Sequence, residues 1–138
     1  MLTRDHQLRV RYAETDRMGY VYYGNYAAYF EVGRVELLRS MGFSYRRLEE
    51  QGWMLPVRDL RIRYMAPARY DDLLTVRTTV PRLPGARIEF DYLITNQQGR
   101  TLVEGATTLV FIDAQSMRPV RAPDDLVEAM GKHFITDP

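Results

Sequence analysis

Hydrophobic and polar residues alternate over several stretches of the chain, in the pattern of strands that are buried on one face. This period of two predicts strands over residues 8–12, 60–64, 74–80 and 88–94. A last strand is predicted over residues 101–112, where apolar residues on both sides indicate that both faces are covered. Because the turn sequences that separate the later strands are short, we expect neighbouring strands to run antiparallel.

Between the first strand and the others, the hydrophobic period changes to that of a helix. Apolar residues recur there at steps of three and four. The stripe consists of Tyr26, Tyr29, Phe30, Gly33, Leu37 and Met41. We expect Asn25 to cap the start of this helix and Gly42 to end it in the left-handed conformation. Since a glycine inside a helix costs about 1 kcal/mol relative to alanine, Gly33 is predicted to let the helix approach a sheet closely.

Two shorter helices are predicted, over residues 44–51 and 124–132. Ser44 is placed to cap the first, and the second has acidic residues in its first turn and a lysine in its last. One strand, a long helix and then a run of strands predict an α+β fold. In it, an antiparallel sheet of about five strands wraps around the long helix. The pattern alone also permits a cystatin-like fold, which wraps a sheet around one helix too.

Composition narrows the function classes. The chain has 138 residues, 46% of them hydrophobic, so residues 1–138 are predicted to form a single domain. The 19 basic and 18 acidic residues give a net charge of +1, which indicates no nucleic-acid partner. The absence of cysteine excludes disulfides, thiolate nucleophiles and cysteine-ligated zinc. No signal peptide is evident, and no apolar run reaches the roughly 18 residues of a membrane span, so we expect a cytoplasmic protein.

The scarcity of histidine and lysine reduces the number of possible catalytic mechanisms further. The histidines, His6 and His133, lie near the chain ends, as does Lys132, which is the single lysine. A serine–histidine–acid triad or a Schiff-base lysine would have to rest on chain ends, which lack rigid support. No metal-ligand spacing is present, so we expect no metal. The remaining candidates are carboxylates, hydroxyls, arginines and backbone amides.

One stretch brings a carboxylate and a helix start together. Asp16 lies on a loop that contains Gly19 and leads into the long helix at about Tyr23–Asn25. A helix N-terminus offers unpaired N–H groups and a positive dipole end, which suit an oxygen that becomes negative. A carboxylate beside such donors is a minimal site for acyl transfer. Loop aspartates more often form Asx turns, and the local pattern leaves both interpretations open.

Two motifs carry a resemblance to a known family. They are D-R-M-G-Y-V-Y-Y-G-N-Y, over residues 16–26, and Y-M-A-P-A-R-Y-D-D, over residues 64–72. From about Arg9 to Val127 the chain resembles the 4-hydroxybenzoyl-CoA thioesterase family of hotdog-fold acyl-CoA thioesterases. It is also similar to the branch that includes the thioesterase encoded beside the Tol–Pal envelope system. The resemblance implies the hotdog fold and hydrolysis of an acyl-CoA thioester to a free acid and CoA, with no cofactor beyond water.

The resemblance also implies roles for individual residues. Asp16 matches the family's catalytic aspartate, which acts as general base on water or as nucleophile. The backbone N–H of Tyr23 matches the donor that polarises the thioester carbonyl, and Gly19 and Gly24 would permit the tight path that presents it. Many members of the Tol–Pal-associated branch carry histidine where this chain has Tyr23. No imidazole is therefore expected to transfer protons here.

Substrate-binding residues are predicted in three groups, each of which has a structural alternative. The first group lies beside the helix start. The second opens the strand that, by resemblance, pairs with its symmetry mate across the dimer, where it would wall the acyl channel. The third consists of arginines that would hold the CoA phosphates. The groups are, in that order, Tyr22, Asn25 and Tyr26; Met54, Leu55, Pro56 and Val57; and Arg61, Arg63 and Arg69, with Arg82 and Arg87 also considered. The alternatives are core packing or helix capping, ordinary interface packing, and charges that face water.

The resemblance further implies a homodimer that joins two sheets edge to edge, with the active site between subunits, and a tetramer built from two such dimers. A non-catalytic hotdog protein that binds acyl-CoA as a sensor is the alternative function, and it would have no need of Asp16. An acyl dehydratase of this fold normally depends on an active-site histidine, which the relevant stretch lacks.

Overall fold

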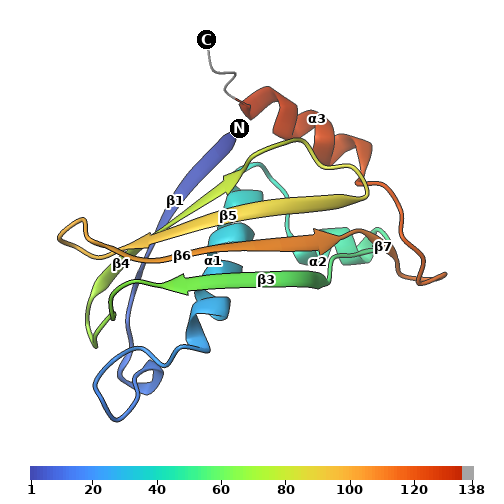
Figure 1. Cartoon of the computed structure of the whole chain (residues 1–138). Coiled ribbons are helices and arrows are strands. Elements are labelled where there is room, and N and C mark those ends of the chain that lie inside the picture. Colours follow the sequence, from blue (N-terminus) through green and yellow to red (C-terminus); the bar gives the residue numbers. More distant parts are fainter. Residues whose placement is uncertain (135–138) are drawn as a thin grey trace.

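A five-stranded antiparallel sheet forms the frame of the protein, and the computed structural model describes it within residues 1–134. The strand order across the sheet is β1-β4-β5-β6-β3 (Figure 1). The strands are β1 (Leu2–Arg9), β3 (Val57–Tyr64), β4 (Leu73–Val80), β5 (Arg87–Thr95) and β6 (Thr101–Val110). The predicted α+β architecture, with about five antiparallel strands, is confirmed.

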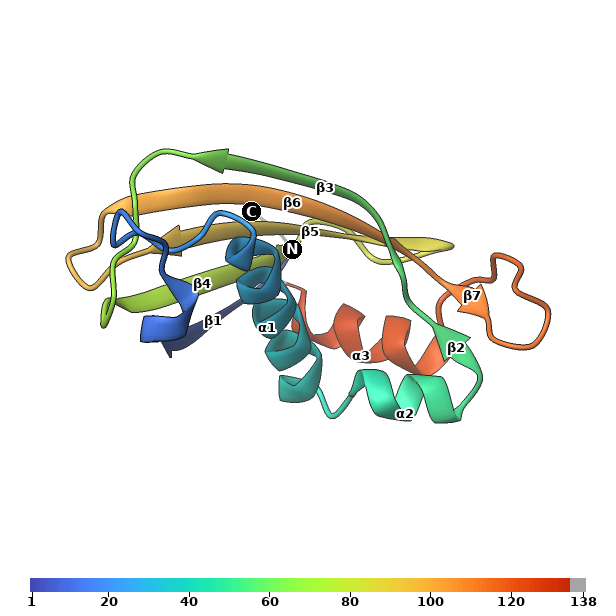
Figure 2. The ribbon, with the colours of Figure 1, turned by 90° about the horizontal axis from the view of Figure 1, so that it is seen from below.

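The long helix α1 (Asn25–Ser40) lies in the hollow of this sheet, which curves over it (Figure 2). Its predicted apolar stripe is confirmed: Tyr26, Tyr29, Phe30, Gly33 and Leu37 are buried, and Met41 is partly buried beyond the helix end. The Phe30 ring stacks on Tyr92 of β5 with 4.2 Å between ring centroids. Burying this aromatic stripe between helix and sheet supplies much of the apolar area that stabilises the fold.

The remaining elements close the ends of this core. They are the 3₁₀ turn η1 (Tyr12–Glu14), α2 (Tyr45–Glu50), α3 (Asp124–His133) and the two-stranded pair β2 (Trp53–Met54) and β7 (Ile112–Asp113). Ser44 caps α2 by accepting a hydrogen bond from Arg47 N–H at 3.1 Å, and Gly42 has φ +84°, both as predicted. Of the helices within residues 1–134, none combines the length and the apolar character needed to cross a membrane.

The first strand begins and ends earlier than predicted. The sequence analysis assigned residues 8–12, whereas β1 covers Leu2–Arg9. Two of its inward positions hold Arg4 and His6 rather than apolar residues, which hid the alternation. Arg4 tolerates that position because α3 lies beside it, with the Arg4 guanidinium 3.4 Å from His133 Nδ1.

Strand neighbours also differ from a simple succession of hairpins. The sequence analysis expected strands joined by short connections to pair, but β3 pairs with β6 at the sheet edge rather than with β4. The strand predicted over residues 101–112 is divided into β6 and the separate β7. Met54 belongs to β2, so the stretch that was expected to open the edge strand contributes only Val57 to it.

A charged side chain of α1 itself lies in the core. Arg34 is 6% exposed, and its Nε donates to the Tyr45 hydroxyl at 2.9 Å. Its Nη1 lies 3.5 Å from the hydroxyl of Tyr92, which in turn shares a hydrogen bond of 2.6 Å with Thr107. Burial acts to lower the pKa of Arg34, but these phenolic contacts outweigh it and raise the pKa. The guanidinium therefore stays charged and links both helices to the sheet.

The predicted close approach at Gly33 is confirmed. A Cβ at this position would lie 2.4 Å from Thr78 Oγ1 and 2.8 Å from Val76 Cγ1, both on β4. The helix backbone therefore lies almost directly on the strand. Thr78 Oγ1 is the buried side-chain polar atom within residues 1–134 that has no hydrogen-bond partner, which shows how closely the two backbones are packed.

We expect Gly33→Ala to lower the free energy of unfolding by about 1–3 kcal/mol, because the added methyl would overpack this contact. Gly131→Ala in α3 is the matched control, since a Cβ there meets no atom of residues 1–134 within 4 Å. That substitution should raise stability by roughly 0.5–1 kcal/mol. Urea unfolding of both variants checks the pair, and equal effects at the two glycines would contradict the packing explanation.

Candidate active site

A short hairpin presents Asp16. Tyr22 N–H donates to Glu14 O at 2.9 Å, Thr15 and Val21 form an antiparallel bridge, and Asp16 N–H donates to Tyr20 O at 2.7 Å. Gly19 has φ +79°, a left-handed conformation that glycine adopts without strain and that the tight turn requires. The hairpin therefore holds the aspartate at its tip in a defined conformation.

The two oxygens of the Asp16 carboxylate have different surroundings. Oδ1 accepts hydrogen bonds from the N–H groups of Met18 at 2.9 Å and Tyr20 at 3.2 Å, as in an Asx turn. Oδ2 has no hydrogen-bond partner among residues 1–134. The structural and functional interpretations of this residue are thus compatible: one oxygen fixes the loop, and the other is free to act on a ligand.

Asp16 borders a cavity of about 340 Å³ between the hairpin, the start of α1 and the end of β3. Its lining is largely apolar and aromatic, and consists of Asp16, Met18, Tyr20, Val21, Tyr23, Tyr26, Tyr64, Met65, Ala66 and Pro67. A hydrogen bond from the Tyr64 hydroxyl to Tyr23 O, 3.2 Å long, joins the two sides. The carboxylate thus lies at the border of an apolar surface of the size that a small acyl group occupies.

The two residues just before α1, Tyr23 and Gly24, supply backbone donors, and Tyr23 lines this cavity. Neither Tyr23 N–H nor Gly24 N–H has an acceptor within residues 1–134, whereas Tyr22 N–H and Asn25 N–H are both hydrogen bonded. Gly24 is the N-cap residue, and a Cβ on it would lie 2.8 Å from Tyr22 Cε1. Two unpaired amides at a helix N-terminus can stabilise a developing oxyanion.

The prediction that Asn25 caps the helix is wrong. Asn25 is the first helical residue, and its Nδ2 instead donates to Glu14 O at 2.8 Å. A side chain at the N-cap position can satisfy the orphan amides of the first turn. Gly24 occupies that position and has no side chain, and the Tyr23 and Gly24 amides, which are unpaired within residues 1–134, lie just before the first helical residue.

Two of the tyrosines at the cavity, Tyr26 and Tyr64, are neutral phenols. Tyr23 and Tyr26 both meet the Tyr64 ring edge to face, with centroid separations of 6.5 and 5.5 Å. Burial raises the pKa of both Tyr26 and Tyr64. Tyr23 and Tyr64 are largely exposed, while Tyr26 is buried and forms the floor. These rings can contact an acyl group without adding a negative charge beside Asp16.

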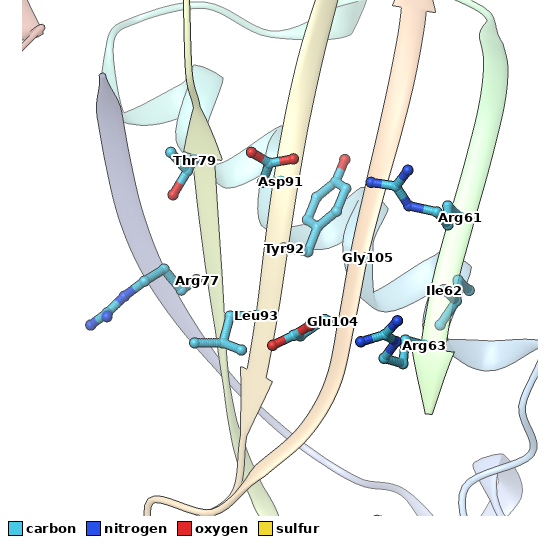
Figure 3. A pocket seen from close by; sticks show the side chains of 10 residues that line it. All are labelled: Arg61, Ile62, Arg63, Arg77, Thr79, Asp91, Tyr92, Leu93, Glu104 and Gly105. Atoms are coloured by element: carbon cyan, nitrogen blue, oxygen red, sulfur yellow. The ribbon is translucent and has the colours of Figure 1, made fainter. Parts of the chain in front are cut away.

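The three arginines predicted to hold CoA phosphates lie in two places. Arg61 and Arg63 project from β3 on the outer face of the sheet, near Asp91 and Glu104 and away from the cavity (Figure 3). Arg69 lies next to the cavity, because residues 20 and 69 form a bridge and its guanidinium stacks 5.1 Å from the centre of the Tyr20 ring. Within one chain, only Arg69 of these three adjoins the Asp16 site.

Of the other predicted substrate-binding residues, some lie at the cavity and others do not. Tyr26 lines the cavity, Asn25 is used in the link to Glu14, and Tyr22 is half exposed outside the lining. The segment Met54–Val57 lies at the opposite end of β3 from Tyr64, which is about 23 Å away at the rise of a strand. It cannot line the Asp16 cavity of its own chain.

Several lining residues were not singled out from the sequence. Met18 lies inside the first quoted motif, and Tyr64, Met65 and Pro67 lie inside the second, so the two motifs meet across the cavity. The presence of both motifs in the sequence was therefore the signal from which these lining residues could have been predicted. No cluster of three metal-ligating side chains occurs in the part of the chain that the structure describes.

Comparisons with known proteins agree with this arrangement. Residues 10–130 match the family model of the thioesterase-like superfamily. The putative acyl-CoA thioesterase YneP of Bacillus subtilis is 35% identical over 115 residues, which are 83% of each chain. The acyl-CoA thioester hydrolase YbgC of Escherichia coli is 34% identical over 120 residues, covering 87% of this chain and 90% of that protein.

Solved structures show the same fold. The DHNA-CoA thioesterase of Staphylococcus aureus superposes with a TM-score of 0.90 at 36% identity, covering 96% of this chain and 91% of the other. A 4-hydroxybenzoyl-CoA thioesterase variant, solved in complex with 4-hydroxybenzoyl-CoA, superposes with a TM-score of 0.84 over 94% and 99% of the two chains. Its identity is 19%, so it supports the fold alone.

Proposed function

The chain belongs to the thioesterase-like superfamily and has the hotdog fold, and from its site we propose an acyl-CoA thioesterase that works through Asp16 and the amides of Tyr23 and Gly24. Membership among proteins named as acyl-CoA thioester hydrolases makes it a thioester hydrolase. The observation that carries the residue assignment is geometric. Asp16 and Tyr23 line one cavity, and Asp16 Oδ2 and the amides of Tyr23 and the adjoining Gly24 have no partners in residues 1–134.

The proposed reaction is an acyl transfer to water. The thioester carbonyl oxygen accepts hydrogen bonds from Tyr23 N–H and Gly24 N–H, which stabilise the charge that forms on it. Asp16 Oδ2 takes a proton from a water molecule as that water attacks the carbonyl carbon. The carbon–sulfur bond then breaks, and the CoA thiolate takes up the proton. Direct attack by the carboxylate, followed by hydrolysis of the anhydride, gives the same products with the same groups.

The acyl group would lie against Tyr23, Tyr26 and Tyr64. CoA would leave past Tyr20 and Arg69, where a guanidinium can bind a phosphate. Because Arg69 already stacks on a cavity residue, binding a phosphate there would order the ring next to the thioester. Arg61 and Arg63 stay predictions for the distal part of CoA.

The decisive test is hydrolysis of a panel of short-chain, long-chain and aromatic CoA esters, measured by the release of free CoA thiol. We expect turnover of at least one ester, and a loss of at least about 100-fold for both Asp16→Ala and Asp16→Asn. Asp59→Asn on β3 is the charge-matched control for the second variant. Full activity in Asp16→Asn would refute the assignment, and binding without turnover by the wild type would favour the non-catalytic acyl-CoA-binding alternative.

A second prediction separates the Tyr23 amide from its side chain. Proline has no N–H, so Tyr23→Pro should lower kcat by about 100- to 1,000-fold, corresponding to roughly 2.7–4 kcal/mol of transition-state stabilisation. Tyr23→Ala keeps the amide and should retain most of kcat. Circular dichroism and thermal unfolding establish that both variants are folded. A Tyr23→Ala loss as large as that of Tyr23→Pro would mean that the phenol, not the amide, is required.

The dimer is also part of the proposal, and the exposed edge of the sheet supports it. The backbone of β3 has a free side, and its inward-facing Leu60 and Tyr64 are 47% and 48% exposed. Such an edge is normally covered. Antiparallel pairing of two β3 strands about a two-fold axis would bring Met54–Val57 of one subunit near Tyr64 of the other. This would explain how that segment could wall the cavity. A tetramer would join two such dimers.

We therefore expect Leu60→Glu to weaken the dimer, because each subunit would bury a charge in the joined inner face. Light scattering coupled to size-exclusion chromatography should show a monomer, and the same fractions should have lost thioesterase activity. Asp59→Asn, one residue away and facing outward, should remain dimeric and active. An active monomer would contradict a site shared between subunits.

A further inference from the structure

Glu14 lies at the base of the Asp16 hairpin. It makes several hydrogen bonds, although it has no part in the proposed reaction. Its carboxylate is 17% exposed. Oε1 accepts hydrogen bonds from Arg11 N–H at 2.8 Å and from the Tyr29 hydroxyl at 3.1 Å, and Oε2 lies 3.3 Å from Arg11 Nη2. Its main-chain oxygen accepts from Tyr22 N–H at 2.9 Å and from Asn25 Nδ2 at 2.8 Å. One residue thus joins the end of β1, the hairpin and the first turns of α1.

These contacts fix the two halves of the proposed site relative to each other. Asp16 follows Glu14 by two residues on one arm of the hairpin, and Tyr22, which bonds to Glu14 O, precedes the Tyr23 amide on the other arm. Asn25 and Tyr29 are on α1, so their hydrogen bonds to Glu14 also fix the position of the hairpin relative to the helix. Displacing Glu14 would change the distance between Asp16 Oδ2 and the free amides.

Tyr29 makes the side-chain link costly to lose. It is 3% exposed, and burial, followed by the Glu14 charge, raises the pKa of its hydroxyl, which therefore stays protonated as a donor. Without the carboxylate this buried hydroxyl would lose its acceptor. The exposed Arg11 side chain cannot replace the link, because it offers donors only.

We propose that Glu14 is a positioning residue for thioester hydrolysis, which holds the Asp16 carboxylate in register with the Tyr23 and Gly24 amides. This inference rests on the proposed function. Since misplacement of a catalytic group by about 1 Å can cost about 100-fold in rate, the link acts on kcat rather than on substrate binding. Glu14 needs no contact with substrate to do so.

The test compares Glu14→Ala, Glu14→Gln and Tyr29→Phe with Glu128→Ala, an exposed glutamate of α3, as control. We expect Glu14→Ala to lower kcat by roughly 10- to 100-fold with little change in KM, and Tyr29→Phe to cause a smaller loss. Glu14→Gln keeps an acceptor oxygen for Arg11 N–H and Tyr29, so it should recover to within about threefold of wild type. Glu128→Ala should be unchanged.

A second set of variants shows whether Glu14 acts through Asp16. In an Asp16→Asn background, Glu14→Ala should cause no further loss of kcat, because there is no longer a carboxylate to position. A merely structural role would lower the residual rate further, and that result would overturn the proposal. Equal losses in Glu14→Gln and Glu14→Ala, or an unchanged kcat in Glu14→Ala, would also overturn it.

Thermal unfolding accompanies each variant. Should Glu14→Ala fail to fold, Tyr29→Phe decides: a lower kcat at unchanged KM in the folded protein supports the link, and a wild-type kcat refutes it. Wild-type turnover and its loss in Asp16→Asn are measured in the same assay. Failure of those two measurements would reject the thioesterase assignment itself, whereas their success together with a wild-type kcat in Glu14→Ala would reject only the positioning role.

Discussion

Two peptide N–H groups at the start of α1 must remain without acceptors in a region where almost every neighbouring amide is paired. Tyr22 N–H and Asn25 N–H both donate hydrogen bonds. Within residues 1–134, the N–H groups of Tyr23 and Gly24, which lie between them, have no acceptor. Leaving amides unpaired costs free energy unless water or a ligand satisfies them. Both groups precede Asn25, the first residue of α1, so the hydrogen bonds within the helix cannot satisfy them.

Rigid support on two sides keeps that arrangement in place. From the sheet side, Tyr64 donates to Tyr23 O, and from the β1 side the hairpin is bonded to α1 through Glu14. The helix itself cannot shift along the sheet, since Gly33 lies directly on β4 and Phe30 stacks on Tyr92. A change in core packing that moved α1 would therefore also move the site, because the start of α1 forms part of it.

Local periodicity was sufficient to predict α1, its buried stripe and the close contact at Gly33, since these depend on spacing within one element. The start of β1 was not predictable in that way, because its inward positions hold Arg4 and His6, and Arg4 lies against His133 of α3, a contact that only the tertiary structure brings about. The Asx turn at Asp16 was one of two interpretations that the loop sequence left open, and the role of the Tyr23 amide was implied by the family resemblance. Gly24 as N-cap was not predicted, because the side chain of Asn25 is bonded to Glu14, far away in sequence. The cavity wall from Tyr64 and Met65 likewise depends on how β3 is placed.

The buried guanidinium of Arg34 has a consequence for how the protein responds to alkali. Its partners are phenols, not carboxylates, and burial raises the pKa of Tyr45 to about 12 and also raises that of Tyr92. Their neutral forms are thus favoured by folding, and the stability that they contribute is complete below the ordinary tyrosine pKa of 10.0 and is lost only above it. Across the neutral range the interior keeps a single charge state. A proton-linked change in turnover in that range therefore does not come from Arg34, Tyr45 or Tyr92.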